Sequence, residues 1–301
     1  MAQGRLRILI LGSAAGGGLP QWNCGCRNCV KARRGEIPSR SQSSIAVSAD
    51  GETWAVVNAS PDIRAQLTAS PALHPSGPRA SPIRGVLLTN GDIDHVAGLL
   101  TLREQQPFSL YHTSEIGAVL RDNRIFDALN PELVERRTIV LGEPVEIAPG
   151  VTAEMFAVPG KVPLFMEEGE VRTDLEGEQT VGVRLGAGGA SAFYIPGCAR
   201  MTGALAERLR GAELVLFDGT LWQDDEMIRA GVGRKTGARM GHMTMQGRDG
   251  SLRAFAGLGV ARKVYVHINN TNPVLDPETP ERRAVEDAGW IVAEDGMELT
   301  P

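Results

Sequence analysis

Short apolar runs rich in β-branched residues recur along the chain and constrain its fold more than any other feature of the sequence. Most are bounded by Gly, Pro, Asn or Asp, which are typical of turns. The predicted strands come in clusters with helical patterns between them, an order that indicates a layered α/β protein rather than a strictly alternating βαβ barrel. The expected strands cover 7–11, 44–48, 54–58, 85–88, 109–112, 138–141, 152–158, 180–185, 192–195, 214–217, 263–267 and 290–293.

The helical patterns complete this outline. The expected helices cover 62–69, 96–104, 113–121, 203–210, 245–258 and 280–288. No repeat period is visible, and the proline-rich stretch 70–82 is short enough to be a loop between a helix and a strand. A chain of 301 residues buries a full core without disulfides. We therefore expect one domain over residues 1–301.

Charge and hydropathy exclude some classes of protein. The chain has 31 Lys and Arg against 36 Asp and Glu, a net charge of −5, which argues against a general nucleic-acid-binding protein. The first apolar run, at 8–11, is too short for a signal peptide or a membrane span. We expect a cytoplasmic protein with no membrane or nucleic-acid partner.

The segment 88–99, LTNGDIDHVAGL, carries the strongest local signal for chemistry. An apolar strand is followed by Asp92, Asp94 and His95, and then by the apolar start of a helix. Side chains at the carboxyl end of a strand face the crevice where α/β sheets place their sites. Two carboxylates and an imidazole this close can chelate one divalent ion. A polar turn with Asp94 as helix cap is about equally favoured by these residues alone.

Three cysteines, Cys24, Cys26 and Cys29, lie within six positions. This spacing suits a metal better than disulfide pairing. Three thiolates favour a structural zinc, which normally takes four ligands. A reduced cluster without metal is the alternative. Cys198 is far away in the sequence and is expected to be an ordinary buried thiol.

Several segments together resemble the metallo-β-lactamase superfamily. The segment 88–99 is similar to its His-x-His-x-Asp-His motif, with Asn90 and Asp92 in the first two histidine positions. VPGKVP at 158–163 resembles its Pro-Gly-His-Thr segment, with Lys161 in the histidine place, and VYVH resembles its last strand, which ends at His267. Gly197 stands where an aspartate usually bridges two metals. The resemblance implies an αββα sandwich.

More narrowly, the chain resembles a family of this superfamily that acts in the biosynthesis of the redox cofactor pyrroloquinoline quinone (PQQ). The resemblance extends over nearly the whole chain. It is carried by the segments 23–29, 90–95, 216–222, 241–245 and 267–273. It implies that the protein carries out a step in making PQQ. Whether the chain forms a homodimer or contacts other proteins of the pathway is left open by the resemblance.

The departures from the superfamily pattern imply one active-site metal rather than two. An ammonium group such as that of Lys161 cannot ligate a metal while charged, and it repels a cation. The resemblance implies that the ligands of the second metal are retained as Asp94, His95 and His267, and that Asp92 is close enough to act as a further ligand. This set suits iron(II) with open positions better than a hydrolytic zinc pair. Lys161 is expected to fill the vacated site as a cation, and a solvent-facing lysine is the alternative.

The resemblance also suggests roles for Asp218, His242 and Asn270. A carboxylate and a histidine at similar places form a proton relay in hydrolytic relatives, so Asp218 and His242 are expected to orient or protonate the substrate. Asp218 joining the metal, or His242 being purely structural, are the alternatives. Asn270 or a neighbour stands where relatives complete the cysteine zinc site, and water is a further option.

These expectations favour an iron-dependent oxygenase that hydroxylates the tyrosine ring of a glutamate–tyrosine intermediate. Lys161 or Arg234 would hold the carboxylates of that intermediate. The segment 224–240, with Arg234, Lys235 and Arg239, is either a flap that offers cations to an acidic substrate or a solvated loop. A metal-dependent hydrolase and a non-catalytic carrier of finished PQQ are the two alternative functions.

Overall fold

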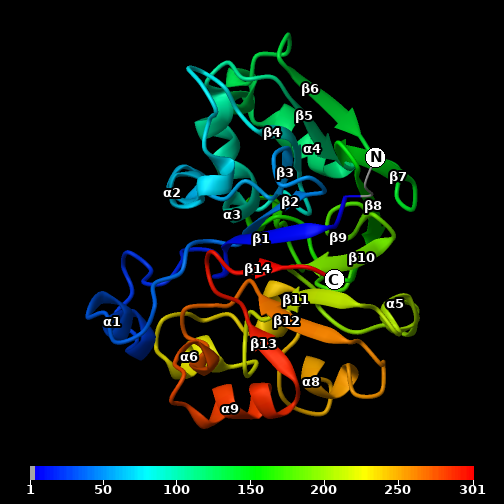
Figure 1. Cartoon of the computed structure of the whole chain (residues 1–301). Coiled ribbons are helices and arrows are strands. Elements are labelled where there is room, and N and C mark those ends of the chain that lie inside the picture. The colour runs from blue at the N-terminus through cyan, green and yellow to red at the C-terminus, as the bar shows by residue number, and fades with distance from the viewer. Residues whose placement is uncertain (1–3) are drawn as a thin grey trace.

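The computed structural model describes residues 4–301. In it, two seven-stranded sheets pack face to face, and helices cover both outer faces (Figure 1). The first sheet has the order β14-β1-β2-β3-β4-β5-β6 and the second the order β13-β12-β11-β10-β9-β8-β7. The αββα sandwich expected from the resemblance is therefore confirmed. No helix in the described range is long and apolar enough to cross a membrane.

The strands of the first sheet are β1 (Arg7–Gly12), β2 (Ser44–Ser48), β3 (Trp54–Val57), β4 (Ile83–Leu87), β5 (Phe108–His112), β6 (Val134–Thr138) and β14 (Glu298–Leu299). Those of the second are β7 (Pro144–Ala148), β8 (Val151–Ala157), β9 (Val181–Ala187), β10 (Ala190–Ile195), β11 (Leu214–Asp218), β12 (Arg262–Val266) and β13 (Trp290–Val292). The α-helices are α1 (Arg27–Arg33), α2 (Ile63–Ala69), α3 (Ile93–Val96), α4 (Ser114–Asp122), α5 (Gly203–Leu209), α6 (Glu226–Arg229), α7 (Gly237–Met240), α8 (Ser251–Ala254) and α9 (Pro280–Asp287).

The alternation of side chains along each strand builds three apolar layers. In β1, Ile8 and Ile10 face the layer between the sheets, whereas Leu9 and Leu11 face the outer layer beneath α2, α3 and α4. In β12, Val264 faces the central layer. Burial on both faces explains why these strands appear in the sequence as continuous apolar runs.

Parallel strands bring the polar loops of the two sheets to one edge. The strands β3 to β6 run parallel in the first sheet, and β10 to β13 run parallel in the second. Their carboxyl ends carry the segments that follow β4, β10, β11 and β12. The site is assembled from these loops, in agreement with the general position of sites in α/β sheets.

Three sequence-based elements differ in extent or type from the structure. In place of the helix expected at 96–104, α3 ends at Val96 and a 3₁₀-helix covers Ala97–Arg103. The strand expected at 138–141 lies earlier, as β6, because pairing with β5 makes a strand of a segment that includes Glu135, Arg136 and Arg137. Of the helix expected at 245–258, only α8 forms a regular α-helix. Gly247, with a φ of 98°, precedes it in a turn that is incompatible with a continuous helix.

Candidate metal centre

A cavity of about 410 Å³ opens at the edge where the loops meet. It lies between segments that are far apart in the sequence, and it contains most of the polar residues that the sequence analysis singled out. Its lining includes Ala15, Gly16, Gln21, Asn90, Asp92, Asp94, His95, Lys161, Leu164, Pro196, Thr220, Met227, Lys235, Met240, His242, His267 and Asn269.

Asp94, His95 and His267 form a compact cluster of metal-ligating atoms, all within 4.8 Å of one another. Asp94 Oδ1 lies 3.2 Å from His95 Nδ1, and Asp94 Oδ2 lies 3.1 Å from His267 Nε2. Both ring nitrogens of His95 are buried and lack a hydrogen-bond partner in the described structure. Buried polar atoms are normally paired, so this orphaned imidazole fits a metal ligand.

The ionisation of the cluster suits a cation. Burial opposes the charge on Asp94, yet His95 and His267 lower its pKa well below the usual value. Burial also lowers the pKa of His267. Burial opposes a charge on His95, but the carboxylate of Asp94 raises the pKa of this histidine, so a metal would displace a proton from it. A carboxylate and a neutral imidazole are the forms that ligate metals.

His267 has a strained backbone. It directly follows β12 and has a φ of 54°, in the left-handed region that non-glycine residues seldom adopt, although His, Asn and Asp do so more often than others. Its neighbour Ile268 donates its amide to Ser13 O at 2.9 Å, which holds the turn in place. Strain of this kind is found where the surrounding structure over-determines a functional residue.

Asp218 and His242 lie in direct contact, as expected for a relay. Asp218 Oδ2 is 2.7 Å from His242 Nδ1 and also accepts the backbone amide of Cys198 at 2.8 Å. Burial opposes the charge on Asp218, but His242 and the hydrogen bonds lower its pKa. Asp218 and His242 also form a second compact cluster with His267. The geometry thus allows Asp218 either to take part in a proton relay with His242 or to ligate a metal.

Thr220 connects the two clusters, and the sequence analysis missed it. Its Oγ1 lies 2.6 Å from Asp218 Oδ1, 3.1 Å from His242 Nδ1 and 2.9 Å from His267 Nδ1. The available signal was its position two residues after an aspartate that ends an apolar strand.

Asp92 lines the same cavity but belongs to neither compact cluster. It is the N-cap residue of α3, and its Oδ1 accepts the backbone amide of Leu164 at 3.0 Å. Asp94 lies inside α3 rather than at its cap, so the helix-cap alternative for that residue is wrong. The geometry leaves Asp92 a neighbour of the three-residue cluster.

Lys161 is turned inward, with only 11% of its side chain exposed. Its Nζ lies 3.1 Å from Glu167 Oε1 and donates to Val162 O at 3.1 Å. The solvent-facing alternative is therefore wrong. Within residues 4–301, Lys161 forms an ion pair with Glu167 and with no aspartate of the cavity.

None of the three cysteines of the cluster lines the cavity; they belong to α1, which is labelled in Figure 1, and to the loop before it. The sulfur atoms of Cys24, Cys26 and Cys29 lie within 4.8 Å of one another. Asn270 is beside them, with its Nδ2 3.2 Å from Cys29 Sγ, and Asn28 holds the backbone oxygen of Asn270 at 3.0 Å. All four residues named for a zinc site are thus brought together.

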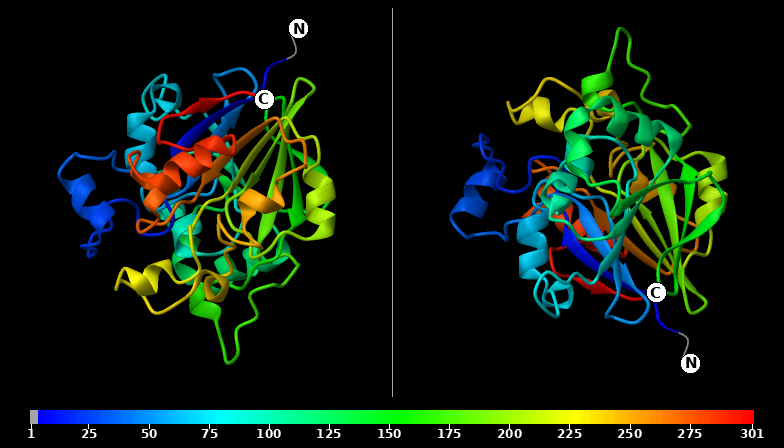
Figure 2. Two further views of the ribbon diagram at one scale, coloured as in Figure 1. Left: turned by 90° about the horizontal axis from the view of Figure 1, so that it is seen from below. Right: turned by 90° about the horizontal axis from the view of Figure 1, so that it is seen from above.

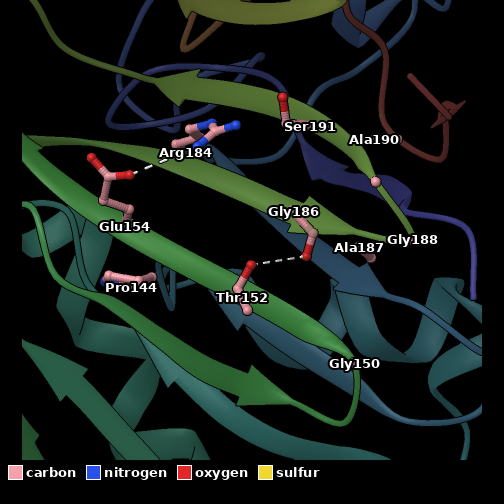
Figure 3. A pocket seen from close by; sticks show the side chains of 11 residues that line it. Pro144, Gly150, Thr152, Glu154, Arg184, Gly186, Ala187, Gly188, Ala190 and Ser191 are labelled. Carbon is pink, nitrogen blue, oxygen red and sulfur yellow. Dashed lines mark hydrogen bonds and ion pairs between the residues drawn. The ribbon is translucent and has the colours of Figure 1, made fainter.

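A second cavity, of about 310 Å³, lies over the second sheet at strands β7 to β10 (Figure 3). Glu154 and Arg184, which are opposite each other on the adjacent strands β8 and β9, form an ion pair in its lining with a nearest N–O distance of 3.9 Å. It contains none of the three compact metal-ligand clusters found in the described residues. We therefore place the functional site in the cavity at the loop edge.

The sandwich and its edge clusters define a metallo-β-lactamase-like protein, and residues 53–268 match the beta-lactamase superfamily domain. The chain belongs to the coenzyme PQQ synthesis protein B family. It is 58% identical over 294 residues to the coenzyme PQQ synthesis protein B of Ruegeria pomeroyi, a match that covers 98% of this chain and 99% of the relative. It is 57% identical over 298 residues to the protein of the same name from Methylobacterium sp., a match that covers 98% of this chain and 100% of the relative. A crystal structure of Zn(2+)-bound PqqB from Methylobacterium extorquens, 56% identical, covers 97% of this chain and 99% of its own with a TM-score of 0.96.

Proposed function

We propose that this protein is an oxygenase of PQQ synthesis that uses one iron(II) ion to hydroxylate the tyrosine ring of a glutamate–tyrosine intermediate. The observation that carries the proposal is the cluster of Asp94, His95 and His267. Two imidazoles and one carboxylate with open positions are the ligand set of non-haem iron(II) oxygenases. The bound iron would supply the electron transfer needed to activate dioxygen.

The positions that hold a second metal in dinuclear relatives support the same reaction class. Here they are filled by Asn90, Asp92 and Lys161, and Lys161 brings a positive charge to the cavity. A cation there opposes a second metal ion. The remaining ligands are enough for one ion, which argues against the dinuclear hydrolytic arrangement.

His242 and Asp218 are proposed to handle a proton of the substrate. Asp218 is buried and bonded to His242 Nδ1, which leaves the other ring nitrogen of His242 free to face the cavity that it lines. A histidine oriented in this way by a carboxylate can accept the proton of a phenol hydroxyl. The charge on Asp218 stabilises the resulting imidazolium.

We propose zinc as a second, structural metal at Cys24, Cys26 and Cys29, with Asn270 beside it. The zinc ion of the relative from Methylobacterium extorquens supports metal binding by this family. Thiolates favour zinc, whereas the imidazole and carboxylate set of the cavity accepts iron. The two sites would then differ in the metal they hold.

Metal content and oxygen uptake, measured on the same preparations, test the proposal. Protein produced with iron and without added zinc should hold iron in the cavity and consume oxygen with the glutamate–tyrosine compound and a reductant. Protein whose cavity holds zinc should be inactive, because zinc cannot change oxidation state. Equal activity with zinc would refute the oxygenase. Release of a cleavage product would indicate a hydrolase, and tight PQQ binding without turnover a carrier.

A further inference from the structure

Three basic side chains converge on the carboxylate of Glu167. Lys161 Nζ lies 3.1 Å from its Oε1, while Arg239 Nη2 and Lys235 Nζ lie 2.8 Å and 3.6 Å from its Oε2. Only 8% of the Glu167 side chain is exposed. Hydrogen bonds from Arg239 and the charge of Lys161 lower the pKa of Glu167 to about 2, so it is ionised throughout the physiological range. One carboxylate thus meets three cations and leaves two positive charges unbalanced.

Two of the three cations in this basic cluster line the cavity at the loop edge. Lys161 and Lys235 line the same cavity as Asp94, His95 and His267. The cations come from two separate parts of the chain, the segment after β8 and the segment from α6 to α7. The cavity thus holds the carboxylates of Asp92 and Asp94 together with the ammonium groups of Lys161 and Lys235. A ligand that spans it is therefore expected to be anionic where it meets the cations.

Glu167 is carried by an arm, defined here as residues 161–174. The base of the arm is closed by two backbone hydrogen bonds between Gly160 and Leu175, of 2.9 Å and 2.8 Å. In both views of Figure 2 the green segment after β8 projects from the body of the molecule, close to the yellow segment around α6. Beyond its base, the arm is joined to the rest of the molecule by the ion pairs of Glu167 with Lys235 and Arg239 and by a hydrogen bond of 3.0 Å from Leu164 N to Asp92 Oδ1.

The first part of the arm is unusually apolar for a surface. Leu164, Phe165 and Met166 are consecutive, and 56%, 49% and 43% of each residue is exposed. Leu164 also lines the cavity. Exposed apolar groups beside a polar cavity indicate a binding surface rather than a solvated loop. Exposure of these three side chains to water is unfavourable and adds nothing to the packing of the fold.

We propose that Lys161, Lys235 and Arg239 form a carboxylate subsite of the cavity, and that Glu167 occupies this subsite until a carboxylate of the substrate displaces it. The ligand class is an aromatic compound with two or more carboxylates. This class rests on the proposed function, because a linked glutamate and tyrosine provides both the ring and the carboxylates. The exchange keeps the three cations paired with a carboxylate in both states and makes binding selective for acids.

Binding of isophthalate, a simple aromatic dicarboxylate, tests the subsite by calorimetry on the full chain. Glu167→Gln removes the competing charge and should bind isophthalate about tenfold more tightly than wild type, because the apparent affinity rises with the fraction of free subsite. Glu168→Gln is the matched control. It removes the same charge from an exposed neighbour that forms no ion pair in the described structure, and it should bind like wild type. Lys235→Gln, added to Glu167→Gln, should reverse most of the gain.

Equal affinities of Glu167→Gln and Glu168→Gln would overturn the proposal, and so would a failure of all the proteins to bind isophthalate. Equally tight binding of the neutral diamide of isophthalate would show that carboxylates are not recognised. Oxygen uptake is measured separately on the same preparations. A subsite that binds acids in a protein without oxygenase activity would refute only the proposed function. An active oxygenase with no effect of Glu167 would refute only the subsite.

Discussion

The hydroxyl group of Thr220 is bonded to the ring of His267, with 2.9 Å between Oγ1 and Nδ1. Thr220 donates its proton to Asp218, 2.6 Å away, so toward His267 it acts as an acceptor. This arrangement places the ring proton of His267 on Nδ1 and leaves Nε2, which faces Asp94, free to bind a metal. A threonine outside the ligand set therefore selects the tautomer of a ligand.

Replacement of Thr220 by Val should lower the affinity for the active-site metal about 10- to 100-fold, because this is the usual effect of losing a residue that orients a metal-ligating histidine. Thr220→Ser keeps the hydroxyl group and should retain most of the affinity. Titration of the purified variants with iron(II) under anaerobic conditions measures the effect. Equal metal affinities of the Val and Ser variants would disprove the orienting role.

His267→Gly should abolish oxygen uptake and remove the cavity metal with little loss of fold. Glycine adopts a φ of 54° without strain, so the backbone turn is preserved while the ligand is lost. Metal analysis should still find zinc at the cysteines, and circular dichroism should show intact secondary structure. His74→Ala, at an exposed histidine remote from the cavity, is the control and should keep both metals. A His267→Gly protein that still binds iron stoichiometrically would contradict the ligand set.

Cys26→Ser should lose about one zinc per chain and leave the cavity metal in place. The cysteines lie outside the residues that line the cavity, so the two metals should respond independently. The loop from Trp22 to Val30 should become more sensitive to proteolysis, because three thiolates and a zinc ion would hold it. Zinc content equal to that of wild type would exclude a structural zinc at this cluster.

Glu226 should make the stability of the protein fall as the pH rises toward neutrality. Burial raises the pKa of Glu226 to about 7, although Thr271 donates to its Oε1 at 2.6 Å. The folded state holds the proton more tightly than the unfolded state. The resulting stability is therefore fully present below the unfolded pKa of about 4.3 and is lost as the pH rises through about 7.

Denaturant unfolding of wild type and Glu226→Gln between pH 5 and pH 8 measures this contribution. The Gln variant cannot titrate, so its free energy of unfolding should fall less with pH than that of wild type, by up to about 3 kcal/mol. Parallel pH profiles of the two proteins would show that folding does not raise the pKa of Glu226.

The strand runs and the short motifs were predictable because their information is local. Cys24, Cys26 and Cys29 are close in space because they are close in sequence, and the same holds for Asp94 and His95. The strands of the inner layers could be recognised from their apolar residues. The edge strand β6 could not, because its charged residues form a strand only through pairing with β5.

The amino-acid sequence by itself determined which donor atoms the chain offers, and its resemblance to known families determined the sandwich. Only the tertiary structure decided which donors meet. His267 reaches Asp94 across 173 residues because the parallel strands of two sheets end at one edge. The contacts of Glu167 with Lys235 and Arg239 were equally invisible in the sequence, since these two cations come from a segment some 70 residues further on. Such contacts depend on how the sheets pack, which no local pattern of residues encodes.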